Sequence, residues 1–147
     1  FRESLEVSRK NGFAAYVAAQ DQFNLLERDY ERTLQPTLVE NSLSQLPYFG
    51  LARGFLTGKY RPGKSVDSMR AGGMGSYQNE RGWALLSKID DLASKYQTTV
   101  SAIALAWLRA QPSVAAPIAS ARNLGQLKEI MPVVALSTEE LQTLTNS

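Results

Sequence analysis

Phe13-Ala-Ala-Tyr-Val-Ala-Ala-Gln20 is the stretch that decides the fold. It is a short apolar run bounded by turn-forming residues, which predicts a strand buried on both faces, as in parallel sheets. Residues 43–51 and 114–118 contain two further short runs of the same kind. Three buried strands separated by helical patterns predict a parallel α/β architecture. Because so few strands would leave an exposed parallel edge, a partial barrel explains the pattern better than a doubly wound sheet.

Helical patterns lie between and around these strands. The first is expected to end at Asn11-Gly12, and a helix over 28–41 should kink or begin late at Pro36. Later helices are predicted over residues 78–96, from Thr98 or Thr99 to Pro112, from Asn123, and from Ser137 to the end of the chain.

Two of the later helices begin with a capping pattern, Asn123 with Gln126 and Ser137 with Glu140. Apolar residues at helical spacing predict the faces that these helices bury. In the helix that Thr98 or Thr99 begins, they are Val100, Ile103, Ala104, Trp107 and Leu108. In the helix that Asn123 begins, they are Leu124, Leu127 and Met131.

The composition excludes several kinds of chemistry. The 147 residues include no cysteine and no histidine, so disulfides, thiolate metal sites and catalytic arrangements that need His or Cys are excluded, and no metal site is predicted. A net charge of +2 without a basic stripe gives no support for a nucleic-acid partner. No apolar run is long enough for membrane insertion, and cytoplasm is the default location. The composition favours binding over catalysis.

Residues 52–77 are expected to form a long glycine-rich, basic loop. Seven of the ten glycines lie between residues 50 and 75, and five cations lie between Arg53 and Arg70, opposed only by Asp67. Glycine allows backbone to approach a ligand closely, and cations favour an anion. A solvated loop is an equally good interpretation of this feature alone.

Three segments together resemble the aldo-keto reductase family, whose fold is a (β/α)8 TIM barrel. They are Tyr16-Val-Ala-Ala-Gln-Asp-Gln-Phe-Asn-Leu-Leu-Glu-Arg28, Pro47-Tyr-Phe-Gly-Leu-Ala-Arg-Gly-Phe-Leu-Thr-Gly-Lys-Tyr-Arg61 and Pro117-Ile-Ala-Ser-Ala-Arg-Asn-Leu-Gly-Gln-Leu-Lys-Glu129. The resemblance implies that residues 1–147 are one partial domain, the C-terminal half of the barrel with strands six to eight and their helices. It also implies that NADP(H) is the cofactor.

The resemblance assigns cofactor roles to the ends of the first two strands. Gln20 would hydrogen-bond the nicotinamide carboxamide, and the Tyr48 ring would stack on the nicotinamide. The loop that wraps the pyrophosphate corresponds to Phe49, Gly50, Leu51 and Arg53. Phe49 and Gly50 stand where the family commonly has Ser and Pro, so only backbone contacts can be kept there. Lys59 and Arg70 match basic positions that meet phosphates.

The third segment would hold the adenosine end of NADP(H). Ser120 follows the last strand, and Arg122 occupies the position that binds the 2′-phosphate, for which a guanidinium offers a planar, permanently charged fork. Gln126 and Glu129 would reach the adenosine, and the helix N-terminus adds free N–H groups. Ile130 replaces a common Asn, which removes one adenine contact.

The family's catalytic Asp, Tyr, Lys and His belong to the first four strands, to which nothing in this chain corresponds. The expected function is therefore the cofactor-binding half of a reductase for aldehydes or ketones, without catalytic residues or measurable turnover of its own. There are two alternatives: a non-catalytic or regulatory NADP(H)-binding half-barrel, and an inactive fragment. An exposed barrel face also predicts self-association or pairing with the missing N-terminal half.

Overall fold

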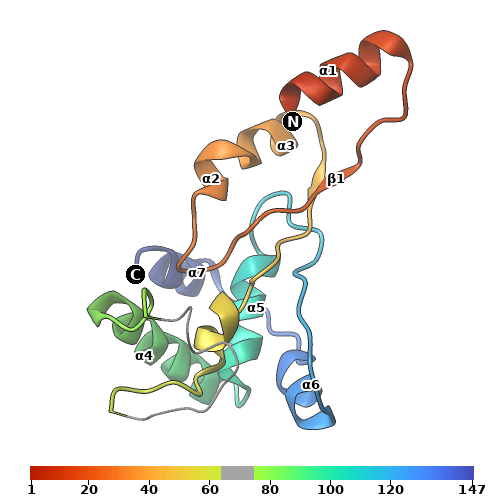
Figure 1. Cartoon of the computed structure of the whole chain (residues 1–147). Coiled ribbons are helices and arrows are strands. Elements are labelled where there is room, and N and C mark those ends of the chain that lie inside the picture. The colour runs from red at the N-terminus through yellow and green to blue at the C-terminus, as the bar shows by residue number, and fades with distance from the viewer. Residues whose placement is uncertain (64–74) are drawn as a thin grey trace.

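The computed structural model describes residues 1–63 and 75–147, and most of its regular structure is helical (Figure 1). In chain order the elements are α1 (Arg2–Asn11), β1 (Ala18–Ala19), α2 (Tyr30–Thr33), α3 (Gln35–Glu40), β2 (Ser44–Gln45), the 3-10 helix η1 (Ala52–Thr57), α4 (Glu80–Lys95), α5 (Val100–Arg109), α6 (Leu124–Ile130) and α7 (Thr138–Thr145).

The strand segments pair in parallel, as predicted. Ala18 is in register with Ser44 in the β1–β2 pair. Gln45 forms a further parallel bridge with Val114, so the three segments lie side by side in the order of the sequence. Regular pairing is much shorter than the apolar runs suggested, and the segment over residues 114–118 makes a bridge without becoming a strand.

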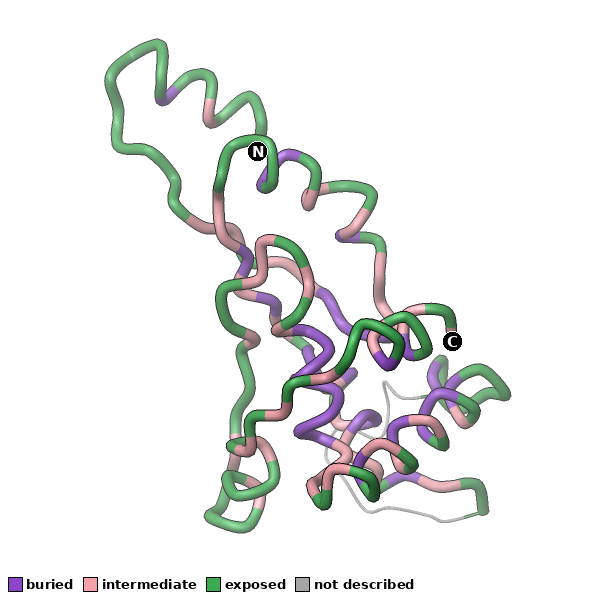
Figure 2. The backbone as a smooth tube through the Cα atoms, turned by 180° about the vertical axis from the view of Figure 1, so that it is seen from behind, coloured by how far each residue is buried: buried purple, intermediate pink, exposed green. Residues whose placement is uncertain are grey.

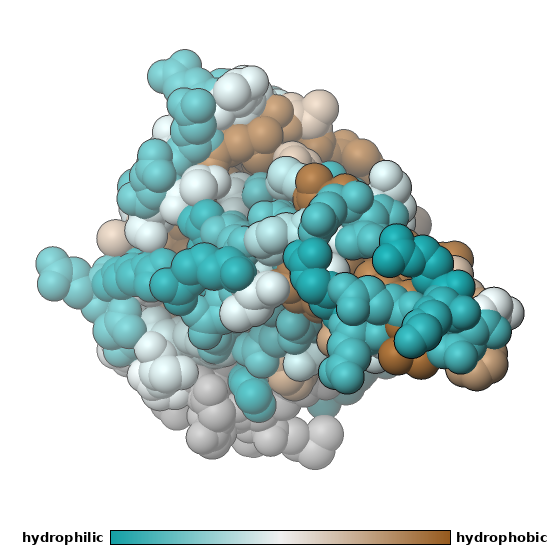
Figure 3. Space-filling model, turned by 90° about the horizontal axis from the view of Figure 1, so that it is seen from above, coloured by the Kyte–Doolittle hydropathy of each residue, from teal (hydrophilic) through white to brown (hydrophobic). Residues whose placement is uncertain are grey.

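The prediction that these segments are buried on both faces is wrong for the first and the third segment. Phe13 is 64% exposed and Val17 is 77% exposed, and Figure 2 shows this part of the chain as largely exposed. Ile118 in the third segment is 41% exposed. Among the described residues only β2 pairs with β1, so the other edge of β1 is free. Apolar surface also reaches the face seen from above, where it appears brown between hydrophilic side chains (Figure 3).

The core lies around α5, which packs against α4, α6 and η1. Every residue from Ser101 to Leu108 is buried, so the predicted one-sided apolar stripe was too narrow. A helix that is buried on all sides belongs to the centre of a core. Trp107 is fully buried, and its ring lies 5.3 Å from the ring of Phe23, which follows β1. This contact joins the sheet segments to the helical core.

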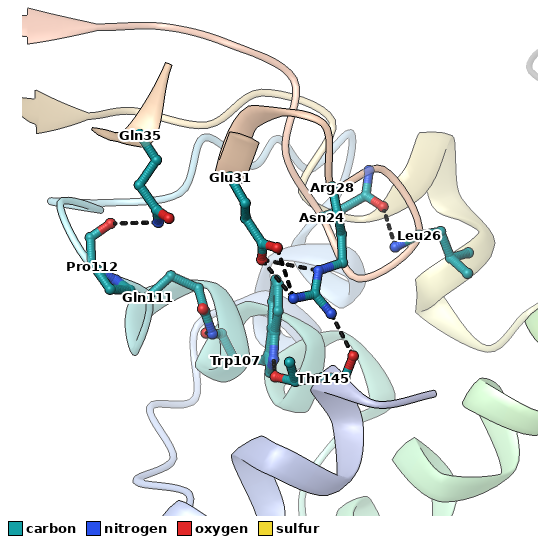
Figure 4. Close-up of polar contacts among 9 residues, drawn as sticks. All are labelled: Asn24, Leu26, Arg28, Glu31, Gln35, Trp107, Gln111, Pro112 and Thr145. Atoms are coloured by element: carbon teal, nitrogen blue, oxygen red, sulfur yellow. Dashed lines mark hydrogen bonds and ion pairs between the residues drawn. The ribbon is translucent and has the colours of Figure 1, made fainter. Parts of the chain in front are cut away.

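A group of polar contacts fixes α7 against the same core (Figure 4). The indole Nε1 of Trp107 donates to Thr145 Oγ1 at 2.9 Å, and the Arg28 guanidinium donates to the backbone oxygen of Thr145. Arg28 also binds both carboxylate oxygens of Glu31. The end of the chain is thereby connected both to α5 and to the segment that precedes α2.

Local signals placed the helix boundaries well. Gly12 takes the left-handed conformation after α1, and Pro36 stands in the first turn of α3, which follows α2 as a separate helix. Thr99 caps α5, and Ser137 forms the predicted capping box with Glu140. The 52–77 segment is less irregular than expected, because η1 begins it, while residues 64–74 lie outside the described part of the chain.

The predicted apolar face of α6 is wrong. Leu124, Leu127 and Met131 are 66%, 41% and 63% exposed. The helix contacts α5, and Ile130 packs against the core. Among residues 1–63 and 75–147, no helix has the length and apolarity that crossing a bilayer requires.

Candidate functional site

A cavity in the described structure has a volume of about 750 Å³, within the roughly 300–1,000 Å³ typical of ligand sites. It lies between the loop after β2, η1, the first turn of α5 and the segment that leads into α6. Its lining comprises Tyr48, Phe49, Gly50, Leu51, Arg53, Gly54, Thr57, Gly58, Lys59, Thr99, Ser101, Ile118, Ala119, Ser120, Arg122, Gln126, Glu129 and Ile130.

Backbone pairing brings the two halves of this lining together. The Tyr48 N–H donates to the Asp21 oxygen at 3.1 Å, which continues the β1–β2 pairing beyond the strands. On the other side of the same segment, the Ile118 N–H donates to the Pro47 oxygen at 2.9 Å. Because parallel strands end at the same edge of a sheet, the residues that follow Tyr48 and Ile118 face one space.

The loop from Phe49 to Gly54 has an unusual backbone. Phe49, Ala52 and Arg53 have φ angles of 54°, 46° and 55°, and Gly54 has a φ of 99°. Left-handed conformations are uncommon for residues with a side chain, each costs on the order of 1–3 kcal/mol, and they gather at functional sites. The loop therefore keeps this shape against its local preferences, and consecutive left-handed residues turn its backbone around the cavity.

Aromatic rings form the wall at this end of the cavity. The Tyr48 and Phe49 rings meet edge to face with centroids 5.2 Å apart. The Arg53 guanidinium lies over the Phe49 ring at 4.6 Å, a cation–π contact. Flat apolar and guanidinium surfaces suit a planar, electron-rich ligand group.

The charge of the lining favours an anion. Arg53, Lys59 and Arg122 line the cavity, whereas Glu129 is the sole carboxylate among its described lining residues. Lys59 lies 4.9 Å from the centroid of the Tyr60 ring, which helps to hold its ammonium group beside the loop. An anionic ligand would therefore gain favourable electrostatic interactions along most of the cavity.

The segment before α6 differs in detail from its predicted capping pair. Asn123 caps α6 as expected, since its Oδ1 accepts from the Gln126 N–H at 2.9 Å. The return contact of a capping box would end on the Asn123 N–H. Gln126 Oε1 instead accepts from the Arg122 N–H at 2.9 Å. This contact fixes the backbone of Arg122 while its side chain stays exposed beside the cavity.

Sequence reasoning missed three polar residues of the lining, Thr57, Thr99 and Ser101. Thr99 Oγ1 accepts from the Ala102 N–H at 3.0 Å and donates to the Glu129 oxygen, so one hydroxyl both caps α5 and holds the end of α6. The sequence predicted the capping role of Thr99. Its place in the cavity wall depends on how α5 and α6 pack, which no local pattern reveals.

Of the twelve residues predicted to bind the cofactor, ten line the cavity. Gln20 follows β1 and is exposed outside this lining. Arg70 lies outside the described residues. The structure thus gathers ten of the predicted residues around one space, from Tyr48 at the expected nicotinamide end to Glu129 at the expected adenosine end.

Comparisons with known proteins agree on one family. The aldo/keto reductase family model matches residues 3–147. The chain is 26% identical to versiconal hemiacetal acetate reductase of Aspergillus parasiticus over 98% of this chain and 43% of that protein. It is 27% identical to a putative aryl-alcohol dehydrogenase of Schizosaccharomyces pombe, over 95% of this chain and 40% of that protein.

Solved structures extend this likeness to the fold. The chain superposes on glycerol dehydrogenase of Gluconobacter oxydans with a TM-score of 0.79 and 26% identity. That match covers 98% of this chain and 45% of the other. The chain therefore spans less than half the length of the relatives that it matches, and its architecture is consistent with part of a TIM barrel.

Proposed function

Because the chain belongs to the aldo/keto reductase family, we propose that it binds NADP(H) for the reduction of an aldehyde or ketone. The chain would supply the cofactor-binding part of such a reductase. Its carbonyl substrate would be a small molecule, and a cytoplasmic location is part of the proposal.

One observation carries this proposal: a single cavity extends from Tyr48 to Arg122. A dinucleotide needs a flat surface for its nicotinamide, donors and positive charge for its phosphates, and a cation for a 2′-phosphate. The Tyr48 and Phe49 rings offer the flat surface. The Phe49–Gly54 backbone and Lys59 offer the donors and the positive charge for the phosphates. Arg122 is placed to offer the cation for the 2′-phosphate.

The chain's own residues would bind and orient the cofactor. NADPH, when bound, supplies the hydride that reduces the carbonyl carbon. Stacking on Tyr48 would fix the face of the ring that meets the substrate, and the cations would hold the pyrophosphate and the 2′-phosphate. No residue of this chain is assigned to donate a proton.

A fluorescence titration with NADPH and NADH tests the proposal. We expect the chain to bind NADPH more tightly than NADH, and Arg122→Glu to weaken NADPH binding by about 10- to 100-fold, since a hydrogen bond to a charged group contributes roughly 1.5–3 kcal/mol. NADH binding should change much less, because NADH lacks the 2′-phosphate.

Arg9→Glu is the matched control, since Arg9 is an exposed cation in the last turn of α1 that does not line the cavity. It should leave the dissociation constant for NADPH within about twofold at moderate salt, because a distant surface charge is largely screened. Equal affinity for NADPH in the Arg122→Glu chain and the unmodified chain would overturn the proposed role of Arg122.

A further inference from the structure

A buried asparagine holds the unusual loop after Tyr48. Asn24 is fully buried, and its Nδ2 donates to the backbone oxygen of Phe49 at 2.9 Å. Its Oδ1 accepts from the Leu26 N–H at 2.8 Å, a contact drawn in Figure 4, and from the Glu27 N–H at 3.0 Å. The 24–27 turn is thus built around the same side chain that fixes the carbonyl of Phe49.

A buried tyrosine adds a second connection from this turn. The Tyr77 hydroxyl donates to Glu27 Oε1 at 2.7 Å. Its ring is 6% exposed and lies 5.9 Å from the ring of Phe55 in η1, which fixes its position. The Tyr77 hydroxyl therefore holds the carboxylate of Glu27 at a defined place.

Arg53 is connected to this turn through Phe49. Burial raises the pKa of Tyr77, the Glu27 carboxylate raises that pKa further, and the Arg53 guanidinium beside the hydroxyl opposes the shift. The same guanidinium lies over the Phe49 ring at 4.6 Å. Hydrogen bonds therefore connect Tyr77 to the 24–27 turn and the turn to Phe49, and the ring of Phe49 lies under the Arg53 guanidinium.

We infer that Asn24 and Tyr77 are positioning residues, which hold the left-handed backbone of Phe49 and Arg53 so that Arg53 faces the cavity. This inference rests on the proposed function, since the anionic ligand that Arg53 would meet is NADP(H). Neither residue lines the cavity, so each would act on the ligand through the loop. Phe49 and Arg53 both require support, because their left-handed backbone is intrinsically unfavourable.

Tyr77→Phe tests the inference, because it removes one hydroxyl and keeps the ring against Phe55. The dissociation constant for NADPH should rise by about threefold to tenfold, the effect of one hydrogen bond. Tyr30→Phe is the matched control. It also removes a buried hydroxyl with one hydrogen bond, 2.7 Å from Ser113 Oγ, but away from the cavity. The dissociation constant of the Tyr30→Phe chain for NADPH should stay unchanged.

A double-mutant cycle distinguishes positioning from a general structural effect. If Tyr77 acts through Arg53, Tyr77→Phe should have no further effect on NADPH affinity in an Arg53→Ala background. An equal loss of affinity in both backgrounds would overturn the inference. So would an unchanged dissociation constant for Tyr77→Phe alone.

A measurement without the cofactor separates this inference from the proposed function. The Arg53 Nε–Hε signal in a proton–nitrogen NMR spectrum, assigned by its loss in Arg53→Lys, should be sharp in the unmodified chain and in Tyr30→Phe. It should broaden or disappear in Tyr77→Phe and in Asn24→Asp, which loses the donor to Phe49. If NADPH does not bind but these spectra change as expected, the proposed function fails and the positioning of Arg53 stands. An unaltered Arg53 signal in both variants would refute the positioning role whatever the cofactor does.

Discussion

Tyr48 and Arg122 border the same cavity, although Tyr48 follows β2 and Arg122 precedes α6. Backbone pairing between Ile118 and Pro47 at 2.9 Å aligns the two segments, so their distance in sequence becomes proximity in space. The cavity between them contains three cations and one carboxylate among the described lining residues.

The close packing of Gly82 against Tyr77 gives a prediction about stability. A Cβ atom at Gly82 would lie 1.9 Å from the backbone oxygen of Tyr77, a contact that backbone cannot relieve cheaply. Gly82 lies within α4, where alanine would ordinarily stabilise a helix by about 1 kcal/mol. We expect Gly82→Ala instead to lower the free energy of unfolding by about 1–3 kcal/mol, the usual cost of overpacking, as measured by urea denaturation.

Gly75→Ala is the control for that substitution, because a Cβ at Gly75 meets nothing within 4 Å. Its free energy of unfolding should stay within about 0.5 kcal/mol of the unmodified chain. A Gly82→Ala chain as stable as the unmodified one would show that α4 and Tyr77 do not approach each other in this way.

Glu140 gives a prediction about acid stability. The pKa of its carboxyl falls from 4.5 to about 2, chiefly because the Lys95 ammonium binds it, with further help from Ser137 and Tyr96. A lowered folded-state pKa stabilises the fold at pH values above the unfolded pKa. The stabilisation from Glu140 should therefore be complete above about pH 4.5 and be lost as the pH falls toward 2.

Denaturant unfolding at several pH values between 2 and 6 measures this dependence. Glu140→Gln should reduce stability near neutral pH and flatten the loss in acid, because glutamine keeps a capping oxygen but carries no charge. Glu139→Gln, at the exposed neighbouring position, should retain the steep loss. If stability depended on pH in the same way for Glu140→Gln and the unmodified chain, Glu140 would not be the source of the acid sensitivity.

The exposed segment before β1 predicts association of the chain with itself. Phe13 and Val17 are large apolar residues, 64% and 77% exposed, beside an edge of β1 that no described segment pairs. Exposed apolar surface and a free strand edge both favour intermolecular contact. We propose that the chain, when no complementary barrel half is present, forms oligomers at micromolar concentration.

Size-exclusion chromatography with light scattering measures that association. The double variant Phe13→Ser and Val17→Thr should shift the mass toward the monomer. Val39→Thr, at an exposed valine of α3 away from the β1 edge, should not. An unmodified chain that remains monomeric across the micromolar range would refute the predicted self-association.

Sequence reasoning succeeded where the signal is local. The hydroxyl of Thr99 and the Ser137–Glu140 pair satisfy N–H groups within their own helices, so the residues that make a cap are close in sequence. Pro36 at the start of α3 is a similar case. The parallel order of the strand segments was also predictable, because alternation of short apolar runs with helices has few solutions.

Reasoning failed where the outcome depends on packing. Val17 is apolar whether or not another segment covers it. The sequence around Val17 therefore could not reveal that this residue is 77% exposed. Leu124 and Leu127 have helical spacing but are exposed. The contacts of Asn24 and Tyr77 with the loop after Tyr48 join residues that are distant in sequence, and a turn-forming Asn or a lone Tyr carries no sign of such a partner.

The most direct test of the central claim is an NMR titration of the labelled chain with NADP⁺, following backbone amide signals. The account predicts that amides of Phe49–Arg53 and of Ser120–Gln126 shift together and yield one dissociation constant, because one molecule of cofactor would contact both segments. Shifts confined to one of the two segments, or separate dissociation constants for them, would contradict the claim that a single dinucleotide spans the cavity from Tyr48 to Arg122.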